Sequence, residues 1–365
     1  MSIQTAVSAR RRAAVALAAG IAVAGLATGC GGSARASSAG SASAASTTSG
    51  SSAPVPLVVY SAQGYDKAMV TAFQKATGIP TKLVDDSTGP LLARVQAERG
   101  NPKWGVLWVD GDEAFASMDQ AGMLVKGFEP NVRLNAAGQA VVPADKSYVP
   151  TGLTVTAALV YDATKTPNPP TSWQELLTPA WKGQIGMNDP SVSGPTYPFV
   201  AGMFSQLGGT SQGEAFYSGL KSNGLHVFQT NGDTLHALQT GQIKVALIQS
   251  SAGLAAGTKN HNIRTTYLPK VTSLPSVIGI DAKASAQEQA EAEQFASFVL
   301  SAQGQQVMLT GDQNGDSLYW PIVQGVSPQA ALPPLSSVPT QAIDPKTWGP
   351  QEGTINTWFT DTIVH

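Results

Sequence analysis

The chain has 365 residues, only 13% of them are charged, and the formal net charge is −2. So few charges and a slightly negative net charge give no sign of a basic surface. We therefore expect no nucleic-acid binding and no charge-driven attachment to an anionic membrane face. The four histidines, His226, His236, His261 and His365, show no metal-ligand spacing, and neither a metal site nor a cofactor is predicted.

The first 29 residues have the features of an export signal. Arg10, Arg11 and Arg12 form a cationic region, and the apolar run over 13–29 is shorter than a comfortable membrane span. We therefore predict a signal peptide over residues 1–29. A twin-arginine export route is an alternative that the residues after Arg12 do not specially support.

Cys30, the only cysteine of the chain, follows this signal directly. Exported proteins normally carry paired cysteines or none, so a single cysteine at this place is better explained as an acyl anchor than as a stray thiol. Residues 26–30 resemble a bacterial lipobox, with Ala27 where that motif usually has Leu. We predict that Cys30 is lipidated and anchors the protein to the outer side of the cell membrane, facing the periplasm or the cell exterior.

A tether is predicted between this anchor and the folded body. Residues 31–53 are Gly, Ala, Ser and Thr apart from Arg35. They cannot bury enough apolar surface to offset the entropy lost on ordering, so residues 30–53 should form a flexible linker.

The body from Pro54 onward is long enough for two lobes of ordinary domain size. Its first part, residues 54–153, shows β-rich runs at 57–60, 81–84 and 106–109, each followed by a helical pattern. Strands that alternate with helices predict an α/β fold with a helix-covered, mostly parallel sheet.

The same alternation recurs further along the chain. We assign residues 154–264 to a second lobe with strands near 185–187 and 245–248. Residues 265–310 are expected to return to the first lobe, and residues 311–365 to form a C-terminal segment that packs on both lobes.

Small polar residues repeatedly follow a predicted strand and precede a helix. Ligands of open α/β sheets bind outside these strand ends, where helix N-termini attract anions and hydroxyl groups add hydrogen bonds. Each such residue could instead be a simple helix cap, but several together favour a shared ligand site. The predicted ligand-binding residues are Ser61, Ser87, Thr88, Gly89, Asp110, Ser191, Ser193, Gly194, Thr230, Asn231, Gln249 and Ser250.

Two motifs resemble known functional sites only in their letters. The segment 209–213 reads G-x-S-x-G, but a nucleophile elbow needs a strand directly before Ser211, where a helix end and its stop are predicted. The segment 312–316 lacks the spacing of a calcium loop and is predicted to be a turn. We therefore expect no catalytic residues, and a hydrolase with His226 or His236 as its base is the less favoured alternative.

Taken together, short motifs along the folded body resemble the extracellular solute-binding proteins grouped with ferric-ion-binding proteins. The matching segments are Leu57–Ser61, Phe73–Gly78, Leu91–Val95, Ala121–Gly122, Tyr161, Pro170–Trp173, Trp181–Gly183 and Asp189–Pro190. The resemblance implies a two-lobed periplasmic-binding-protein fold of type 2, whose lobes close by a hinge on a small molecule or ion. It also implies a monomer that delivers its ligand to the permease subunits of an ABC importer. Members bind ferric ion, thiamine, sugar phosphates or phosphonates such as 2-aminoethylphosphonate.

The resemblance also bears on which ligand this chain takes. The His, the Glu and the adjacent tyrosines of ferric-binding members fall on Gly64, Asp110 and Ser251–Ala252, so the usual iron ligand set is missing. A cleft rich in hydroxyls favours an oxyanion, a phosphonate or organophosphate, with Asp110, Asp112 or Asp233 facing an amine at the ligand's other end. Ferric iron held partly by a bound anion, and a ligand-sensing lipoprotein that signals through a kinase, stay open as alternatives.

Overall fold

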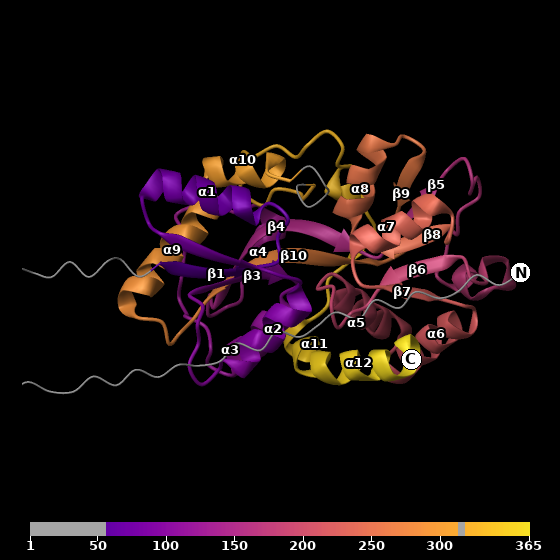
Figure 1. Ribbon diagram of the computed structural model, residues 1–365, viewed down its shortest axis with the longest axis horizontal. Coiled ribbons are helices and arrows are strands. Elements are labelled where there is room, and N and C mark those ends of the chain that lie inside the picture. The colour runs from indigo at the N-terminus through magenta and orange to yellow at the C-terminus, as the bar shows by residue number, and fades with distance from the viewer. Residues whose placement is uncertain (1–55, 313–317) are drawn as a thin grey trace, which may run out of the picture. The chain divides into compact units, whose positions relative to one another are not determined.

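The computed structural model describes residues 56–312 and 318–365 (Figure 1). The predicted signal peptide, the lipidated Cys30 and the linker over 30–53 lie outside the described residues. So does most of the predicted turn at 312–316. The body, Ala53–His365, is one compact unit.

The first sheet is built around a parallel core. β1 (Leu57–Ser61) pairs in parallel with β2 (Thr81–Asp85) and with β3 (Val106–Asp110). β10 (Val271–Ile280) runs antiparallel to β3 and to β4 (Tyr148–Thr156), and it pairs with the short β11 (Thr340–Gln341). The order is β11-β10-β3-β1-β2, with β4 on β10.

Helices follow the strands of this sheet as the alternating sequence pattern predicts. The helices are α1 (Asp66–Thr77), α2 (Thr88–Ala97), α3 (Glu113–Gln120), α4 (Ala136–Gln139), α9 (Ala286–Leu300) and α10 (Ala302–Thr310). Met69, Val70 and Phe73 form the buried face of α1, and Gly78 ends that helix with a φ of 74°, a conformation that favours glycine.

The second sheet has the order β7-β6-β8-β5-β9. Its strands are β5 (Ala158–Asp162), β6 (Ile185–Asn188), β7 (His226–Phe228), β8 (Val245–Ile248) and β9 (Ile263–Thr266). β6 is parallel to β7 and β8, whereas β5 is antiparallel to β8 and β9. The helices here are α5 (Thr196–Leu207), α6 (Thr210–Ser222), α7 (Asn231–Thr240) and α8 (Ser250–Lys259), with short 3-10 turns at Gln174–Leu177 and Pro179–Trp181.

The predicted two-lobed α/β architecture is confirmed, but both sheets are mixed instead of mostly parallel. The antiparallel pairs come from β4, β5 and β10, the strands by which the chain passes between the two sheets (Figure 1). We call the first sheet with its helices the first lobe, and the second sheet with its helices the second lobe.

The chain crosses between the lobes at two points. β4 runs almost directly into β5 through Ala157, and the chain returns between β9 and β10. Both crossings contain a non-glycine residue with positive φ, Ala157 at 67° and Lys270 at 61°, which marks them as bends of the backbone. Thr265 and Thr266, expected in the returning segment, still pair with β5 in the second sheet. The return therefore begins after Thr266.

The C-terminal part contacts both lobes. It contains the 3-10 turns Leu335–Ser337 and Gly349–Gln351, the helices α11 (Pro345–Trp348) and α12 (Glu352–Phe359), and a final π-helical turn, Thr360–Val364. Gly349 packs against the backbone of Glu113 in α3 so closely that a Cβ there would lie 2.2 Å from the carbonyl oxygen of Glu113. Phe359 packs edge-to-face on Tyr217 of α6.

Candidate ligand-binding cleft

The carboxyl ends of the central strands carry the polar residues that the sequence singled out. Ser61 is the last residue of β1 and pairs with Asp85 at the end of β2, while Asp110 ends β3. In the second lobe, Asn188 ends β6 and Gln249 directly follows β8. These are the edges at which ligands of open α/β sheets bind.

A buried indole fixes the position of the β3 end. The Nε1 of Trp108 donates to Thr151 Oγ1 at 3.1 Å and to Ser276 Oγ at 3.0 Å, which ties β3 to β4 and β10. The indole is fully buried, and the ring of Phe295 packs edge-on against it. The following carboxylate, Asp110, is therefore held on a rigid strand.

Asp110 is the centre of a hydrogen-bond network that joins the two lobes. Its Oδ1 accepts from Gln63 Nε2 at 2.9 Å, and its Oδ2 accepts from the hydroxyl of Tyr319 at 2.7 Å and from Gln249 Nε2 at 3.4 Å. Gln249 Nε2 also donates to Tyr319 Oη at 2.7 Å. Burial raises the pKa of Asp110 to about 6, although the hydrogen bonds from Gln63, Tyr319 and Gln249 oppose this shift.

On the second lobe the network continues through side-chain amides. Asn231 Nδ2 donates to Gln249 Oε1 at 3.4 Å, and Asn231 Oδ1 accepts from Asn188 Nδ2 at 2.7 Å. Asn188 Nδ2 also donates to Ser193 Oγ at 3.1 Å. Thr234 Oγ1 donates to Asn188 Oδ1 at 2.6 Å. This network brings the N-termini of α7 and α8 together beside Asp110.

The lobes touch directly at a second place, where glycines permit it. The N–H of Gly89 donates to the carbonyl of Val192 at 3.1 Å. A Cβ on Gly89 would lie 2.0 Å from the carbonyl oxygen of Ser191, and a Cβ on Gly194 would lie 2.4 Å from Thr88 Oγ1. These four predicted residues, Thr88, Gly89, Ser191 and Gly194, line one pocket of about 490 Å³ together with residues of α3 and α12.

The remaining predicted residues have different surroundings. Ser61 Oγ accepts from the N–H of Gln63 at 3.2 Å, and Ser250 Oγ shares a 2.9 Å hydrogen bond with Thr154 Oγ1 of β4. Both side chains are fully buried, so neither hydroxyl is exposed to solvent in this arrangement. Thr230 caps α7 by accepting from the N–H of Asp233 at 3.2 Å. Ser87 lines a pocket of about 430 Å³ on the first lobe.

Four residues of these networks were not among the predicted site residues: Gln63, Tyr319, Asn188 and Thr234. Gln63 lies two residues after the end of β1, so the strand-end rule could have found it. Tyr319 approaches from the C-terminal part, 209 residues away from Asp110 in sequence, and no local pattern signals that contact.

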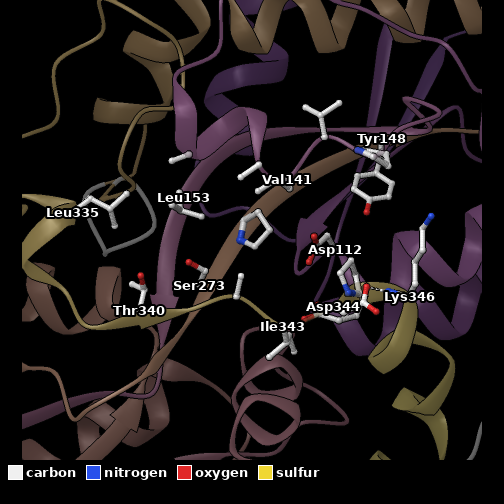
Figure 2. Close-up of a pocket in the computed structure, with 18 residues that line it drawn as sticks. Asp112, Val141, Tyr148, Leu153, Ser273, Leu335, Thr340, Ile343, Asp344 and Lys346 are labelled. Atoms are coloured by element: carbon white, nitrogen blue, oxygen red, sulfur yellow. Dashed lines mark hydrogen bonds between the residues drawn. The ribbon is translucent and has the colours of Figure 1, made fainter. Parts of the chain in front are cut away.

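The other two aspartates suggested as amine partners lie elsewhere. Asp233 is exposed and accepts from Thr230 Oγ1 at 2.8 Å. Asp112 lines a separate pocket of about 350 Å³ between β4, β10 and the C-terminal part, with Tyr148, Asp344 and Lys346 at the same end (Figure 2). Burial and the nearby Asp344 raise the pKa of Asp112 to about 6.

The letters G-x-S-x-G do not form a nucleophile elbow. α5 ends at Leu207, Gly209 directly precedes α6, and Ser211 is exposed on the first turn of α6. A helix therefore stands where a catalytic serine would need a strand. Within residues 56–312 and 318–365, no cluster of three His, Cys, Asp or Glu could hold a metal ion. None of the helices in these ranges combines the length and hydrophobicity needed to cross a membrane.

Residues 68–337 match the family model described as bacterial extracellular solute-binding protein. The chain belongs to this family. Its members are solute-binding components of ABC importers, so this chain is an exported protein that binds a small ligand and interacts with a membrane permease. The resemblance noted from the sequence motifs is thereby confirmed.

Individual relatives differ in what they bind. The chain is 24% identical over 262 residues to a putative 2-aminoethylphosphonate-binding periplasmic protein of Salmonella paratyphi A. The alignment covers 68% of this chain and 75% of that protein. It is 24% identical over 310 residues to the Fe(3+)-binding periplasmic protein of Serratia marcescens, with 80% and 87% covered. The periplasmic binding protein AfuA of Actinobacillus pleuropneumoniae, solved with fructose-6-phosphate, superposes with a TM-score of 0.75 at 17% identity over 85% of this chain and 98% of that one.

Proposed function

We propose that the importer ligand is a small phosphonate or organophosphate whose oxyanion lies between the lobes, against the N-termini of α7 and α8. The observation that carries this proposal is the contact between Asn231 and Gln249, which brings these two helix starts together opposite Asp110. Each helix is ten residues long.

The first backbone N–H groups of a helix have no partner within the helix, and they carry the positive end of the helix dipole. Two such ends side by side favour an oxyanion without a cationic side chain. Ser251, on the first turn of α8, adds a fully buried hydroxyl for which the described residues provide no hydrogen-bond partner. A phosphonate oxygen would supply that partner.

Ser193 is suited to the same role. Its Oγ accepts a hydrogen bond from Asn188, so its own hydrogen can be donated to an anion in the cleft. In this proposal the predicted residues divide into two groups. The second-lobe wall consists of Ser191, Ser193, Gly194, Thr230, Asn231, Gln249 and Ser250. The first-lobe wall consists of Ser61, Ser87, Thr88, Gly89 and Asp110.

Closure is proposed to involve the backbone bends at Ala157 and Lys270. The contacts from Gln249 to Asp110 and from Gly89 to Val192 would form and break as the lobes rotate about these bends. Such contacts between the lobes contribute to the free-energy difference between the open and closed states, which ligand binding shifts toward the closed state.

We further propose that the protein is a monomer held at the membrane through lipidated Cys30. The position of that cysteine after an apolar run and before a linker of small residues supports this. The linker would let the body reach a permease in the same membrane.

Ferric iron is the competing ligand because one relative is named for it. The positions that correspond to the iron ligands of ferric-binding members support this alternative poorly. Gly64 has no side chain, and Ser251 and Ala252 lie on the first turn of α8. Iron is therefore kept as a possible outcome of the binding test.

The test is calorimetry with ethylphosphonate, glycerol phosphate and ferric citrate on the wild type and on Ser193→Ala. A hydrogen bond to a charged group contributes about 1.5–3 kcal/mol, so Ser193→Ala should weaken phosphonate binding roughly tenfold to a hundredfold. Ser211→Ala is the matched control, because Ser211 is exposed on α6. Binding of ferric citrate alone, unaffected by Ser193→Ala, would overturn the oxyanion proposal.

A further inference from the structure

A second polar pocket lies on the first lobe, at the carboxyl ends of β1 and β2. It has a volume of about 430 Å³ and is lined by residues of the two strand-to-helix turns: Ala62, Gln63, Gly64, Asp66, Lys67, Asp85, Asp86 and Ser87. Gln63 connects this pocket to the network that joins the lobes, because its Nε2 donates to Asp110.

Two acceptors at this pocket have no donor within the described residues. Asp66 is 2% exposed, and its Oδ2 is buried without a hydrogen-bond partner. The Ser61 hydroxyl and the N–H of Lys67 act to lower the pKa of Asp66, but the Oδ2 atom has no hydrogen-bond partner among the described residues. Gln63 is also 2% exposed, and its Oε1 is buried without a partner. Buried polar atoms are nearly always paired, so two unpaired acceptors at one pocket point to a missing donor.

Three of the four charged residues that line the pocket are acidic. Asp85 and Asp86 line it beside Asp66. The one lysine of the lining, Lys67, has a side chain that is 80% exposed, and it pairs with Asp85 at 3.6 Å. Burial, together with the charge of Asp85, raises the pKa of Asp66 to about 7, so this carboxylate lacks a strong cationic partner.

We propose that this pocket is a cation subsite, in which a protonated amine of the bound solute donates to Asp66 Oδ2 and Gln63 Oε1. The inference rests on the proposed function, because it assigns the second end of a ligand whose oxyanion lies on the second lobe. The ligand is then bifunctional, with an anionic group toward α7 and α8 and a cationic group toward β1 and β2.

The distribution of charge over the two lobes supports this orientation. On the first lobe, Asp66, Asp85 and Asp86 line the pocket and Asp110 lies beside Gln63. The second-lobe network of Asn188, Asn231 and Gln249 is built from neutral amides and hydroxyls. The carboxylates of Asp189 and Asp233 lie outside that network and accept from Ser191 and Thr230. A zwitterion placed in the opposite sense would bring its anion against the carboxylates of the first lobe. Because like charges at such short distances repel each other, the reversed orientation is disfavoured.

The test compares two ligands that differ only in the amine, 2-aminoethylphosphonate and ethylphosphonate, by calorimetry at pH 8. The wild-type protein should bind the aminophosphonate roughly tenfold to a hundredfold more tightly. Asp66→Asn keeps the size of the side chain and removes its charge. It should abolish this preference by weakening the binding of 2-aminoethylphosphonate, while ethylphosphonate still binds. Asp361→Asn, an exposed aspartate of the C-terminal turn, is the control and should retain the preference.

The outcomes separate the two proposals. Equal affinity for both phosphonates in the wild type, or a preference that survives Asp66→Asn, would overturn the cation subsite and leave the oxyanion proposal standing. If neither phosphonate binds, the proposed function fails and the subsite fails with it. The preference should also shrink at pH 5.5, because a protonated Asp66 no longer attracts an amine; an unchanged preference there counts against the subsite.

Discussion

The hydroxyl of Tyr319 donates a 2.7 Å hydrogen bond to Asp110, so a residue from the C-terminal part of the chain holds the carboxylate at the end of β3. Gln249 of the second lobe donates to both groups. Three parts of the chain therefore meet at one carboxylate. Whatever moves the lobes apart must break the bonds from Gln249 while the bond between Tyr319 and Asp110 can persist.

Tyr319→Phe should lower the free energy of unfolding. The substitution keeps the ring and removes an oxygen that donates to Asp110 and accepts from Gln249, so about 1–3 kcal/mol should be lost. Denaturant unfolding of the purified protein measures the change.

Tyr217→Phe is the matched control for this measurement. The hydroxyl of Tyr217 is buried without a hydrogen-bond partner among the described residues, so its removal should be neutral or stabilising. If the two substitutions destabilise the protein equally, the hydrogen bonds of the Tyr319 hydroxyl at Asp110 do not contribute to the free energy of unfolding.

Gly89→Ala should prevent the lobes from closing fully while each lobe stays folded. The new Cβ would lie 2.0 Å from the carbonyl oxygen of Ser191. To relieve this clash, the backbone at residue 89 and the backbone at Ser191 must move apart. We expect a larger radius of gyration in solution scattering and at least about tenfold weaker ligand binding.

Gly100→Ala serves as the control, because a Cβ at Gly100 meets no atom within 4 Å. If Gly89→Ala scatters and binds like this control, the contact between Gly89 and Val192 is not part of the closed state.

The stability of the protein should fall as the pH rises from 5 to 8. Burial is the main reason that the pKa values of Asp66 and Glu352 rise to about 7, and those of Asp110 and Asp112 to about 6. The folded protein therefore holds protons that the unfolded chain has already released, and this stabilisation is lost as the pH passes through the folded-state values.

Calorimetric melting temperatures from pH 5 to pH 8 test this. The carboxylates with lowered pKa values, such as Asp145 and Asp162, titrate below this range and do not reverse the trend. Asp66→Asn should flatten the decline and Asp361→Asn should not. A melting temperature that rises steadily over the same range would contradict the assignment of these buried carboxyl groups.

Some strands of this fold could be predicted from the sequence and others could not. β1, β3, β6 and β8 are short apolar runs that end in a polar residue or are directly followed by one, so periodicity and strand-end chemistry identified them. β4 was missed because Pro150, Thr151 and Gly152 suggest a loop. The structure tolerates Pro150 because, within the described residues, β10 is the one strand that pairs with β4 along its length, and the opposite side of β4 has a single bridge, from Leu153 to Trp320.

The candidate site was predictable to the same extent. Strand-end reasoning located Asp110, Gln249 and Asn231, which the structure joins in one network. It could not show that Tyr319 completes the network, because that contact depends on how the C-terminal part folds back over both lobes. It also could not show that Asp66 keeps an unpaired oxygen, which depends on burial by residues distant in sequence.

Cys30→Ala should release the protein from the membrane into the soluble fraction. A single acyl-modified cysteine would be the attachment point in the proposed anchor, and the described helices include none able to span a bilayer. Fractionation followed by detection of the full chain measures this. Retention of the variant in the membrane pellet would contradict the lipoprotein proposal.

The most direct test of the account is a crystal structure of the protein grown with 2-aminoethylphosphonate. We expect the phosphonate oxygens to contact the N-termini of α7 and α8 and the Ser193 hydroxyl, with the amine beside Asp66 and Gln63. The ligand found instead in the pocket at Asp112 and Asp344, or lying in the cleft with its phosphonate toward Asp66, would contradict it.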